Sequence, residues 1–217
     1  MKYKLAIFDM DGTILNTLDD LTDALNHSLT VCGYPQRSRE EVRRFLGNGI
    51  RRLTELGVPE GTDNAGTERV FNEFNEYYAV HCADKTAPYD GIIDCIRNLR
   101  NNGIVTAVVS NKTDYAVQIL CEKYFPGLFD FAAGAREGVC KKPHPDLINA
   151  VLSRFSTERG NAVYIGDSEV DIMSAENAEM DCISVEWGFR THEELVSAGA
   201  SVIITNPCEL TRMIITD

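Results

Sequence analysis

Short runs of apolar residues, separated by turn residues, recur through much of the chain. They are rich in Val and Ile, do not alternate cleanly with polar residues, and occupy residues 5–8, 104–110, 129–134, 162–166, 182–187 and 201–205. Continuous apolar runs of this length are typical of strands that are buried on both faces, as in a parallel sheet. The pattern therefore predicts a mainly parallel sheet.

Segments with helical spacing lie between these runs. Residues 90–103 repeat apolar side chains at helical spacing and end at Gly103, a typical helix stop. Three more helical segments are expected at residues 146–155, 168–178 and 191–199. Strands and helices that alternate in this way over residues 88–217 predict a doubly wound, Rossmann-like α/β fold.

The stretch from residue 16 to residue 87 has a different pattern, because it is helical throughout. Leucines recur at helical spacing from Leu18, Ser38 and Glu41 form a capping-box pattern, and residues 67–81 again follow the helical period. We therefore expect residues 1–15 and 88–217 to form an α/β catalytic core. Residues 16–87 are expected to form an inserted all-helical cap, with joints near Asn16 and residues 86–91.

Composition narrows the possible partners and the compartment. The 217 residues carry a formal net charge of −12, which argues against nucleic acid or an anionic membrane as a partner. The seven cysteines contain no Cys-x-x-Cys pair, so free thiols in a reducing cytosol are expected. Neither a signal peptide nor an apolar span of transmembrane length is visible, so we expect a cytoplasmic protein. The sequence does not indicate an oligomeric state.

Polar side chains follow several of the predicted strands. Each one alone is most often a helix N-cap or a solvated loop residue. As a set they appear in chain order at successive strand ends and in one loop, at Asp9, Asp11, Ser110, Asn111, Lys142 and Asp167. Because ligands of parallel sheets bind at the carboxyl ends of the strands, the set predicts a polar site at one sheet edge.

The same residues carry a resemblance to a known family. "DMDGT" at Asp9, "VVSN" at Ser110, "KKPHPD" at Lys142 and "GDSEVD" at Asp167 resemble the four motifs of the haloacid dehalogenase superfamily, in family order. The helical insert also resembles the type of cap that follows the first motif in this superfamily. The second aspartate, Asp11, favours phosphoryl chemistry, because the superfamily's dehalogenases lack it.

Carboxylates can attack phosphoryl groups, and Mg²⁺ readily bridges carboxylates and phosphate. We expect Asp9 to be the nucleophile that forms an aspartyl phosphate, and Asp9 and Asp167 to supply carboxylate oxygens to Mg²⁺. The resemblance implies that Asp11 gives the metal its backbone carbonyl, which leaves its carboxyl group for acid–base catalysis. Lys142 is expected to offset negative charge on Asp9 and the phosphoryl group.

Three further residues are expected to assist. Ser110 and the Asn111 amide can donate hydrogen bonds to phosphoryl oxygens. Asp171 lies four residues after Asp167, so it is expected to orient a metal-bound water or Lys142.

Other stretches suggest the substrate. "GNGI" (47–50), "PYDG" (88–91), "SNK" (110–112) and "WGFRTHEELVSAGA" (187–200) are similar to phosphoglycolate phosphatases. Residues 36–52 also form a basic island, whose arginines are Arg37, Arg39, Arg43, Arg44, Arg51 and Arg52. One interpretation is a solvated helix face. The other is a patch that binds a substrate carboxylate.

On the second interpretation, Gly47, Asn48, Gly49 and Arg51 would contact a small phosphorylated acid such as 2-phosphoglycolate, and Arg37 and Arg39 would face solvent. A pyrophosphatase or a broad sugar-phosphate phosphatase is an alternative. A phosphomutase like β-phosphoglucomutase is less favoured, because Leu21 occupies the position of its cap histidine and His27 lies off that helix face. A non-enzymatic phosphoacceptor module is opposed by the "DGT" turn and by the helical insert.

Overall fold

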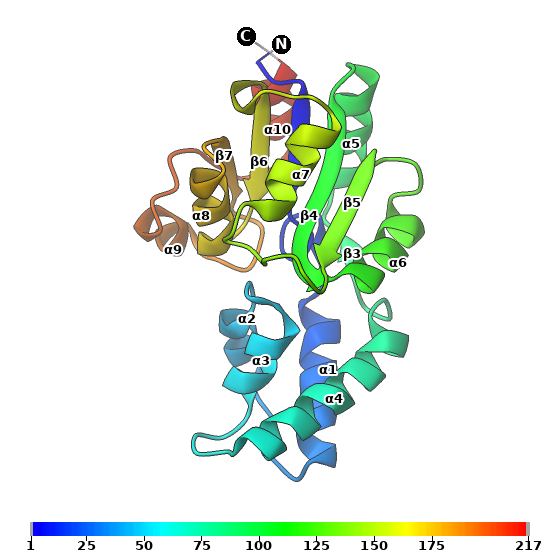
Figure 1. Ribbon diagram of the computed structural model, residues 1–217, viewed down its shortest axis with the longest axis vertical. Helices are drawn as coiled ribbons and strands as arrows, with labels where there is room; N and C mark the ends of the chain where they lie inside the picture. The colour runs from blue at the N-terminus through cyan, green and yellow to red at the C-terminus, as the bar shows by residue number, and fades with distance from the viewer. Residues whose placement is uncertain (1, 216–217) are drawn as a thin grey trace. The chain divides into compact units, whose positions relative to one another are not determined.

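The computed structural model of the chain describes residues 2–215 and divides into two compact units (Figure 1). One unit combines Met1–Leu15 with Pro88–Asp217, and the other is Asn16–Ala87. The two crossings between them are β2 (Leu15–Asn16) and β3 (Ala87–Pro88), which pair as a two-stranded sheet. Among the described residues, no helix is long and apolar enough to cross a membrane.

A six-stranded parallel sheet forms the centre of the first unit, which confirms the predicted doubly wound α/β fold. Its spatial order is β5-β4-β1-β6-β7-β8. The strands are β1 (Leu5–Phe8), β4 (Val105–Thr113), β5 (Phe131–Ala135), β6 (Ala162–Gly166), β7 (Asp181–Val185) and β8 (Ile203–Ile204). Strand β4 extends to Thr113, beyond the predicted end at residue 110, so Asn111 and Lys112 lie within it.

Helices cover both faces of this sheet. α7 (Asp146–Arg154) and α8 (Glu169–Asn177) pack on one face against an apolar cluster that includes Ile7, Val109 and Tyr164. On the other face lie α5 (Ile92–Asn101) and α10 (Pro207–Ile215), which contact each other (Figure 1). The remaining helices are α6 (Asp114–Tyr124) and α9 (His192–Ser197).

Two helices of this unit, α6 and α10, were not predicted. The first turn of α6 begins directly after the last residue of β4, with no Gly or Pro between Thr113 and Asp114. Because Gly and Pro are the strongest local signals of a boundary, their absence hid this one.

The order of the strands fixes where a ligand can bind. The chain runs from β1 through β4 to β5, and then resumes with β6 on the opposite side of β1. Phe8, the last residue of β1, is level with Val108 in β4 and with Ile165 in β6. The carboxyl ends of β1, β4 and β6 therefore meet at a topological switch point, where open α/β sheets bind their ligands.

The second unit consists of four helices, α1 (Leu18–Val31), α2 (Arg39–Phe45), α3 (Gly49–Gly57) and α4 (Asn64–His81). The predicted capping box of Ser38 and Glu41 is present at the start of α2. Helix α3 was not predicted as a separate helix, although residues 16–87 were expected to be helical. Gly47 and Gly49 have φ values of 114° and 80°, in the left-handed region that favours glycine. Gly49 is nevertheless the first residue of the helix.

Arg37 holds the end of α3 in place. Its guanidinium donates to the carbonyl oxygens of Gly57 (2.7 Å) and Val58 (3.1 Å), and its backbone N–H donates to Oδ1 of Asn26 (2.8 Å). These carbonyls lie at the carboxyl end of a helix, where they lack partners within the helix. The expectation that Arg37 faces solvent is therefore wrong.

We predict that Arg37→Ala lowers the free energy of unfolding by about 1.5–3 kcal/mol, the range for hydrogen bonds to a charged group. Arg44 provides a matched control, because its side chain is 64% exposed and forms its ion pair with the exposed Glu40. Arg44→Ala is expected to leave the stability nearly unchanged. Chemical denaturation followed by circular dichroism measures both variants, and equal losses would contradict the role of Arg37.

Candidate active site

Asp9 and Asp11 are held at the point where the chain leaves β1. The backbone N–H of Asp9 donates to the carbonyl of Ile165 in β6 at 2.8 Å, which continues the sheet by one residue. The carbonyl of Met10 then accepts the N–H groups of three residues of the following turn, at 3.0–3.3 Å. Asp9 is buried and Asp11 is half-buried. The turn thus fixes both carboxylates at the switch point.

Lys142 brings a buried ammonium to the same place. Its Nζ lies 2.9 Å from Oδ1 of Asp9, 2.7 Å from Oδ1 of Asp171 and 2.9 Å from the hydroxyl of Tyr164. Asn111 clamps the Lys142 backbone, because its Oδ1 accepts the Lys142 N–H (2.8 Å) and its Nδ2 donates to the Lys142 carbonyl (3.0 Å). The Asn111 side chain is thus already committed, and phosphoryl binding by Asn111 stays a prediction.

Asp171 holds Lys142 and at the same time closes the start of α8. Its Oδ2 accepts the Ser168 hydroxyl at 2.6 Å and the backbone N–H groups of Ser168 (3.1 Å) and Asp167 (3.2 Å). With Oδ1 bound to Lys142, both oxygens have partners. Because one of these partners is the Lys142 ammonium, Asp171 is placed to position Lys142.

Asp167 sits in a tight cradle at the end of β6. Its Oδ1 accepts the Thr13 hydroxyl at 3.0 Å, and its Oδ2 accepts the Phe189 N–H at 2.8 Å. Gly12 and Gly188 approach so closely that a Cβ on either would overlap Asp167. Only glycine leaves room for the carboxylate at these two positions.

The buried charges in this site do not balance. When ionised, the carboxylates of Asp9, Asp167 and Asp171 face one ammonium, so two negative charges remain in excess. Burial raises the pKa of Asp9 to about 7, and the opposing effect of Lys142 only partly offsets it. Burial, together with Asp171 and Asp9, raises the pKa of Asp167 well above its ordinary value. Burial opposes the charge on Lys142, but Asp171 and Asp9 raise its pKa well above the usual range.

A divalent cation with a preference for oxygen fits these residues. Asp9, Asp167 and Asp171 each offer an oxygen within 4.8 Å of the others. Oδ1 of Asp9 is buried and, although it forms an ion pair with Lys142, it lacks an aligned hydrogen-bond partner. Carboxylate and carbonyl oxygens are the ligands that Mg²⁺ prefers. Mg²⁺ would supply the two positive charges that the site lacks.

Sequence reasoning gave no role to Lys112, which lies in the site. Its buried Nζ lies 2.9 and 3.2 Å from the two oxygens of Asp11. Its backbone N–H donates to the hydroxyl oxygen of buried Ser110 at 3.3 Å. The "SNK" stretch contained this signal, but a single lysine after a strand does not reveal its partner.

The segment 187–190 also supports the site, and sequence reasoning gave it no role. Trp187 donates through Nε1 to the Thr13 carbonyl at 3.0 Å, and Gly188 and Phe189 contact Asp167 as described. Arg190 then binds Glu169 through two hydrogen bonds of 2.7 and 2.9 Å, which ties the segment to α8. The "WGFR" stretch therefore braces the acids from a loop distant in sequence.

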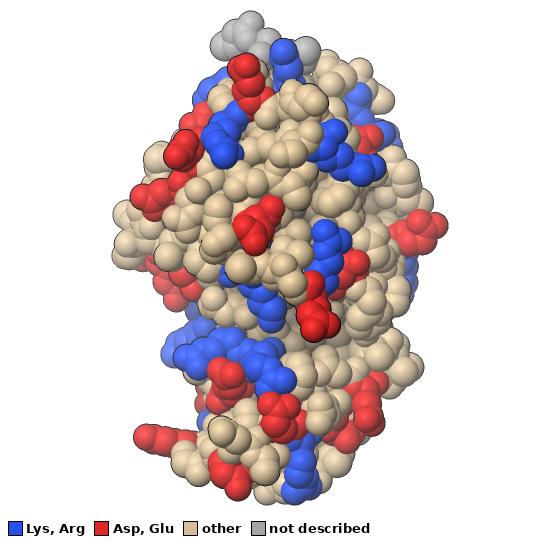
Figure 2. All heavy atoms as spheres, in the orientation of Figure 1, with Lys and Arg blue, Asp and Glu red and all other residues tan. Residues whose placement is uncertain are grey.

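The remaining candidates, Gly47, Asn48, Gly49 and Arg51, belong to the helical unit. Arg51 forms an ion pair with Glu68 through both terminal nitrogens and stacks on the Phe71 ring at 3.8 Å. Every other arginine of the basic island also has a partner, in the pairs Arg37–Glu41, Arg39–Asp19, Arg43–Glu40, Arg44–Glu40 and Arg52–Glu55. Figure 2 shows Lys and Arg side chains beside acidic ones over α2 and α3.

The fold and the site together define a doubly wound α/β protein with a carboxylate-rich site, suited to a divalent cation, at its switch point. Residues 6–185 match the haloacid dehalogenase-like hydrolase family, and the chain belongs to this family.

Relatives in this family narrow the class of enzyme. The chain is 30% identical to a phosphoglycolate phosphatase of Agrobacterium fabrum, over 95% of this chain and 90% of the relative. It is 28% identical to an N-acetylmuramic acid 6-phosphate phosphatase of Pseudomonas aeruginosa, over 97% and 94%. A crystal structure from Lactobacillus delbrueckii subsp. bulgaricus, assigned by inference as a phosphoglycolate phosphatase, shares 41% identity and a TM-score of 0.95, with both chains covered completely. The chain is thus a phosphoric monoester hydrolase.

We predict that Gly188→Ala displaces Asp167, because the added methyl group would overlap that side chain and the Gly12 carbonyl. Overpacking of this kind typically costs about 1–3 kcal/mol of stability. Mg²⁺ affinity, measured by titration calorimetry, should fall at the same time. Gly160→Ala is the control, since a Cβ there meets nothing within 4 Å. Unchanged Mg²⁺ affinity in folded Gly188→Ala would show that Asp167 does not bind the ion.

Proposed function

We propose that this protein is a Mg²⁺-dependent phosphomonoesterase that acts through an aspartyl phosphate on Asp9, with 2-phosphoglycolate as its favoured substrate. The observation that carries the proposal is the buried Asp9 carboxylate. Its Oδ1 lies 2.9 Å from the Lys142 ammonium but has no aligned hydrogen-bond donor. Burial of a carboxylate is costly unless it is paired or coordinates a metal, so this oxygen is suited to bind the ion and to attack a phosphoryl group.

In the first step, a carboxylate oxygen of Asp9 attacks the phosphorus atom, and the ester bond to the leaving oxygen breaks. The product is a phosphoryl group bonded to Asp9 and an alcohol. Lys142 stabilises the added negative charge, because its ammonium is fixed beside Asp9 before substrate arrives. The hydroxyl of Ser110 donates to a phosphoryl oxygen.

The Asp11 carboxyl group moves the protons in both steps. It gives a proton to the leaving oxygen, and then takes one from the water that attacks the aspartyl phosphate. Inorganic phosphate leaves and Asp9 is restored. Lys112 positions Asp11 through its paired contacts of 2.9 and 3.2 Å, and balances its charge whenever the proton is absent.

Asp9 and Asp167, with the backbone carbonyl of Asp11, would hold Mg²⁺. When bound, the ion neutralises the phosphate and the acids around it. Asp171 would act indirectly, because it fixes Lys142, which contacts Asp9.

Selection of the substrate is assigned to the helical unit, which serves as the cap. The core chemistry acts only on the phosphoryl group and does not distinguish leaving groups. The relatives reported above act on phosphoglycolate and on N-acetylmuramic acid 6-phosphate, and both compounds carry a carboxylate as well as a phosphate ester. Arg51 is the proposed contact for that carboxylate. A sugar phosphate that carries an acid is accordingly the second candidate substrate.

A phosphomutase is less well supported. Leu21 is buried in the helical unit, and His27 contacts Glu73 (3.2 Å) and stacks on Tyr77. Both residues therefore have local packing roles. A cytoplasmic location and the absence of nucleic-acid and membrane partners stay predictions.

The direct test is a screen for phosphate release over small phosphorylated metabolites, with and without Mg²⁺. The screen should include 2-phosphoglycolate, acidic and neutral sugar phosphates, and pyrophosphate. We expect the highest kcat/KM on 2-phosphoglycolate. Preference for neutral esters would contradict the substrate assignment, and inactivity on every ester would contradict the phosphatase assignment.

We predict different defects for the two acids of the first motif. Asp9→Asn should form no phosphoenzyme, because an amide does not attack phosphorus. Asp11→Asn should keep the nucleophile but lose proton transfer, which lowers kcat by about 10²–10⁴-fold. Acid quenching followed by peptide mass spectrometry locates the phosphoryl group. Its capture on a residue other than Asp9 would overturn the mechanism.

Removal of the metal should abolish activity. Exhaustive chelation is expected to eliminate phosphate release, and added Mg²⁺ should restore it. Asp167→Asn should raise the Mg²⁺ concentration required for half-maximal rate, because a direct ligand is lost. Asp171→Asn should change that concentration less and lower kcat instead, since Asp171 acts through Lys142. Full activity of the chelated protein would exclude the metal mechanism.

Arg51→Ala should reduce kcat/KM for 2-phosphoglycolate by the equivalent of about 1.5–3 kcal/mol. It should barely affect kcat/KM for an aryl phosphate that carries no charge apart from its phosphate group. Glu68→Gln provides the opposite change, because it releases Arg51 from its ion pair. We expect it to lower KM for 2-phosphoglycolate alone. Equal losses on both substrates in Arg51→Ala, with no effect of Glu68→Gln, would make the island a solvated surface.

A further inference from the structure

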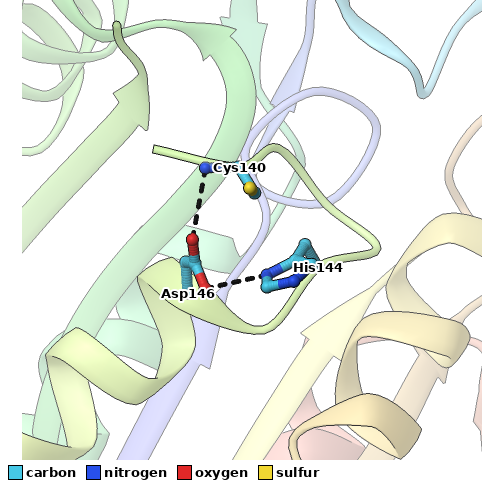
Figure 3. Close-up of side chains that lie close together, drawn as sticks. All are labelled: Cys140, His144 and Asp146. Carbon is cyan, nitrogen blue, oxygen red and sulfur yellow. Dashed lines mark hydrogen bonds and ion pairs between the residues drawn. The ribbon is translucent and has the colours of Figure 1, made fainter. Parts of the chain in front are cut away.

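The loop between β5 and α7 carries a second cluster of possible metal ligands. Cys140 and His144 on this loop and Asp146 at the start of α7 direct their side chains toward one another (Figure 3). One ligand atom from each lies within 4.8 Å of the other two. The thiol and the imidazole are exposed, and Asp146 is partly exposed, so an ion could reach them from solvent. None of the three belongs to the set around Asp9.

Asp146 arranges the other two residues in advance. Its Oδ1 lies 2.8 Å from Nδ1 of His144, and its Oδ2 accepts the backbone N–H of Cys140 at 3.3 Å. Asp146 is the first residue of α7, so a helix fixes the position of its backbone. The cluster therefore has a rigid anchor and does not depend on the loop alone.

We propose that Cys140, His144 and Asp146 bind a thiophilic divalent transition-metal ion, for which Zn²⁺ is the natural probe. A thiolate, an imidazole and a carboxylate are the ligands that Zn²⁺ accepts, whereas Mg²⁺ prefers an all-oxygen set. Three protein ligands would leave one tetrahedral position for water. The two sites of this protein thus differ in the softness of their ligands.

The movement required of the His144–Asp146 pair is small. Ligands about 2.0–2.1 Å from a tetrahedral ion lie roughly 3.3 Å apart. The Nδ1–Oδ1 separation of 2.8 Å in the structure must therefore widen by only about half an ångström. The proton of the Cys140 thiol and any proton shared between His144 and Asp146 would be released to solvent on binding, and the thiolate would bind the ion.

The ion would enclose Lys142 in a short chelate loop. Cys140 and His144 lie two residues before and two residues after Lys142, whose backbone is clamped by Asn111. An ion that joins Cys140 to His144 would restrain this segment at two exposed residues, in addition to the clamp at Lys142. Binding should therefore reduce the motion of residues 140–146 without occupying the Asp9 site.

Co²⁺ titration tests the site, because cobalt–thiolate bonds give a charge-transfer absorption that oxygen ligands do not. The full chain is titrated with saturating Mg²⁺ present, so that the carboxylates around Asp9 are filled. We expect a thiolate band with one equivalent of Co²⁺, which Zn²⁺ displaces. Cys140→Ser should abolish the band, and His144→Asn should weaken Zn²⁺ binding by at least about tenfold, since even outer-shell changes cost 10–100-fold.

Two matched variants control for exposed ligands elsewhere. Cys208 is another exposed thiol, and His192 is an exposed imidazole whose Nδ1 lies 2.9 Å from a carboxylate oxygen of Glu186. Cys208→Ser and His192→Asn should leave the band and the affinity unchanged. A band that persists in Cys140→Ser, or no band in the wild-type protein, would overturn the proposal.

Hydrogen exchange gives a readout independent of catalysis. Zn²⁺ should slow amide exchange of the segment 140–146 in the wild-type protein but not in Cys140→Ser. Unchanged exchange in the wild-type protein would contradict the restraint of the loop. Because none of these measurements uses phosphate release, failure here would leave the proposed phosphatase function intact.

Discussion

The buried ammonium of Lys142 is the interaction on which the rest of the site depends. It lies between the carboxylates of Asp9 and Asp171 and also donates to the Tyr164 hydroxyl, which in turn donates to the Val109 carbonyl in β4. Three buried acids without this cation would repel one another in surroundings where charge is poorly screened. Much of the hydrogen bonding around the site therefore holds Lys142 in place.

That requirement explains features that look unrelated in the sequence. Asn111 clamps the Lys142 backbone from β4, and Asp171 approaches from the first turn of α8. Gly12 and Gly188 meet a separate need, because a side chain at either position would displace Asp167, the third buried acid of the site. Four separate chain segments thus converge on a few atoms. Such convergence is possible because β1 lies between β4 and β6 at the switch point.

The charges of the helical unit are arranged differently from those of the site. Its basic island is neutralised internally, with each arginine paired to an acid of the same unit. A substrate carboxylate that binds Arg51 would have to compete with Glu68, so any affinity is a difference between two similar ion pairs. Such a difference yields selectivity more readily than tight binding.

The sequence alone determined the class of fold, and it predicted the buried acids and the lysine that the structure brings together at the switch point. Apolar runs buried on both faces specify a parallel sheet through local periodicity, and acids at strand ends stand out because their chemistry is costly there. The sequence did not reveal α3 as a separate helix, and it did not reveal α6, since no turn residue separated that helix from β4.

Tertiary structure alone decided the partners. Lys112 binds Asp11, Trp187 donates to Thr13, and Arg37 donates to the end of α3. These partners are too far apart in the sequence for a local pattern to predict them. The same is true of Asn111, which the sequence assigned to substrate and the fold attached to the Lys142 backbone. Periodicity is a property of neighbouring residues along the chain. Hydrogen bonds and ion pairs between distant segments depend on register and on the direction of each side chain, which only the folded packing sets.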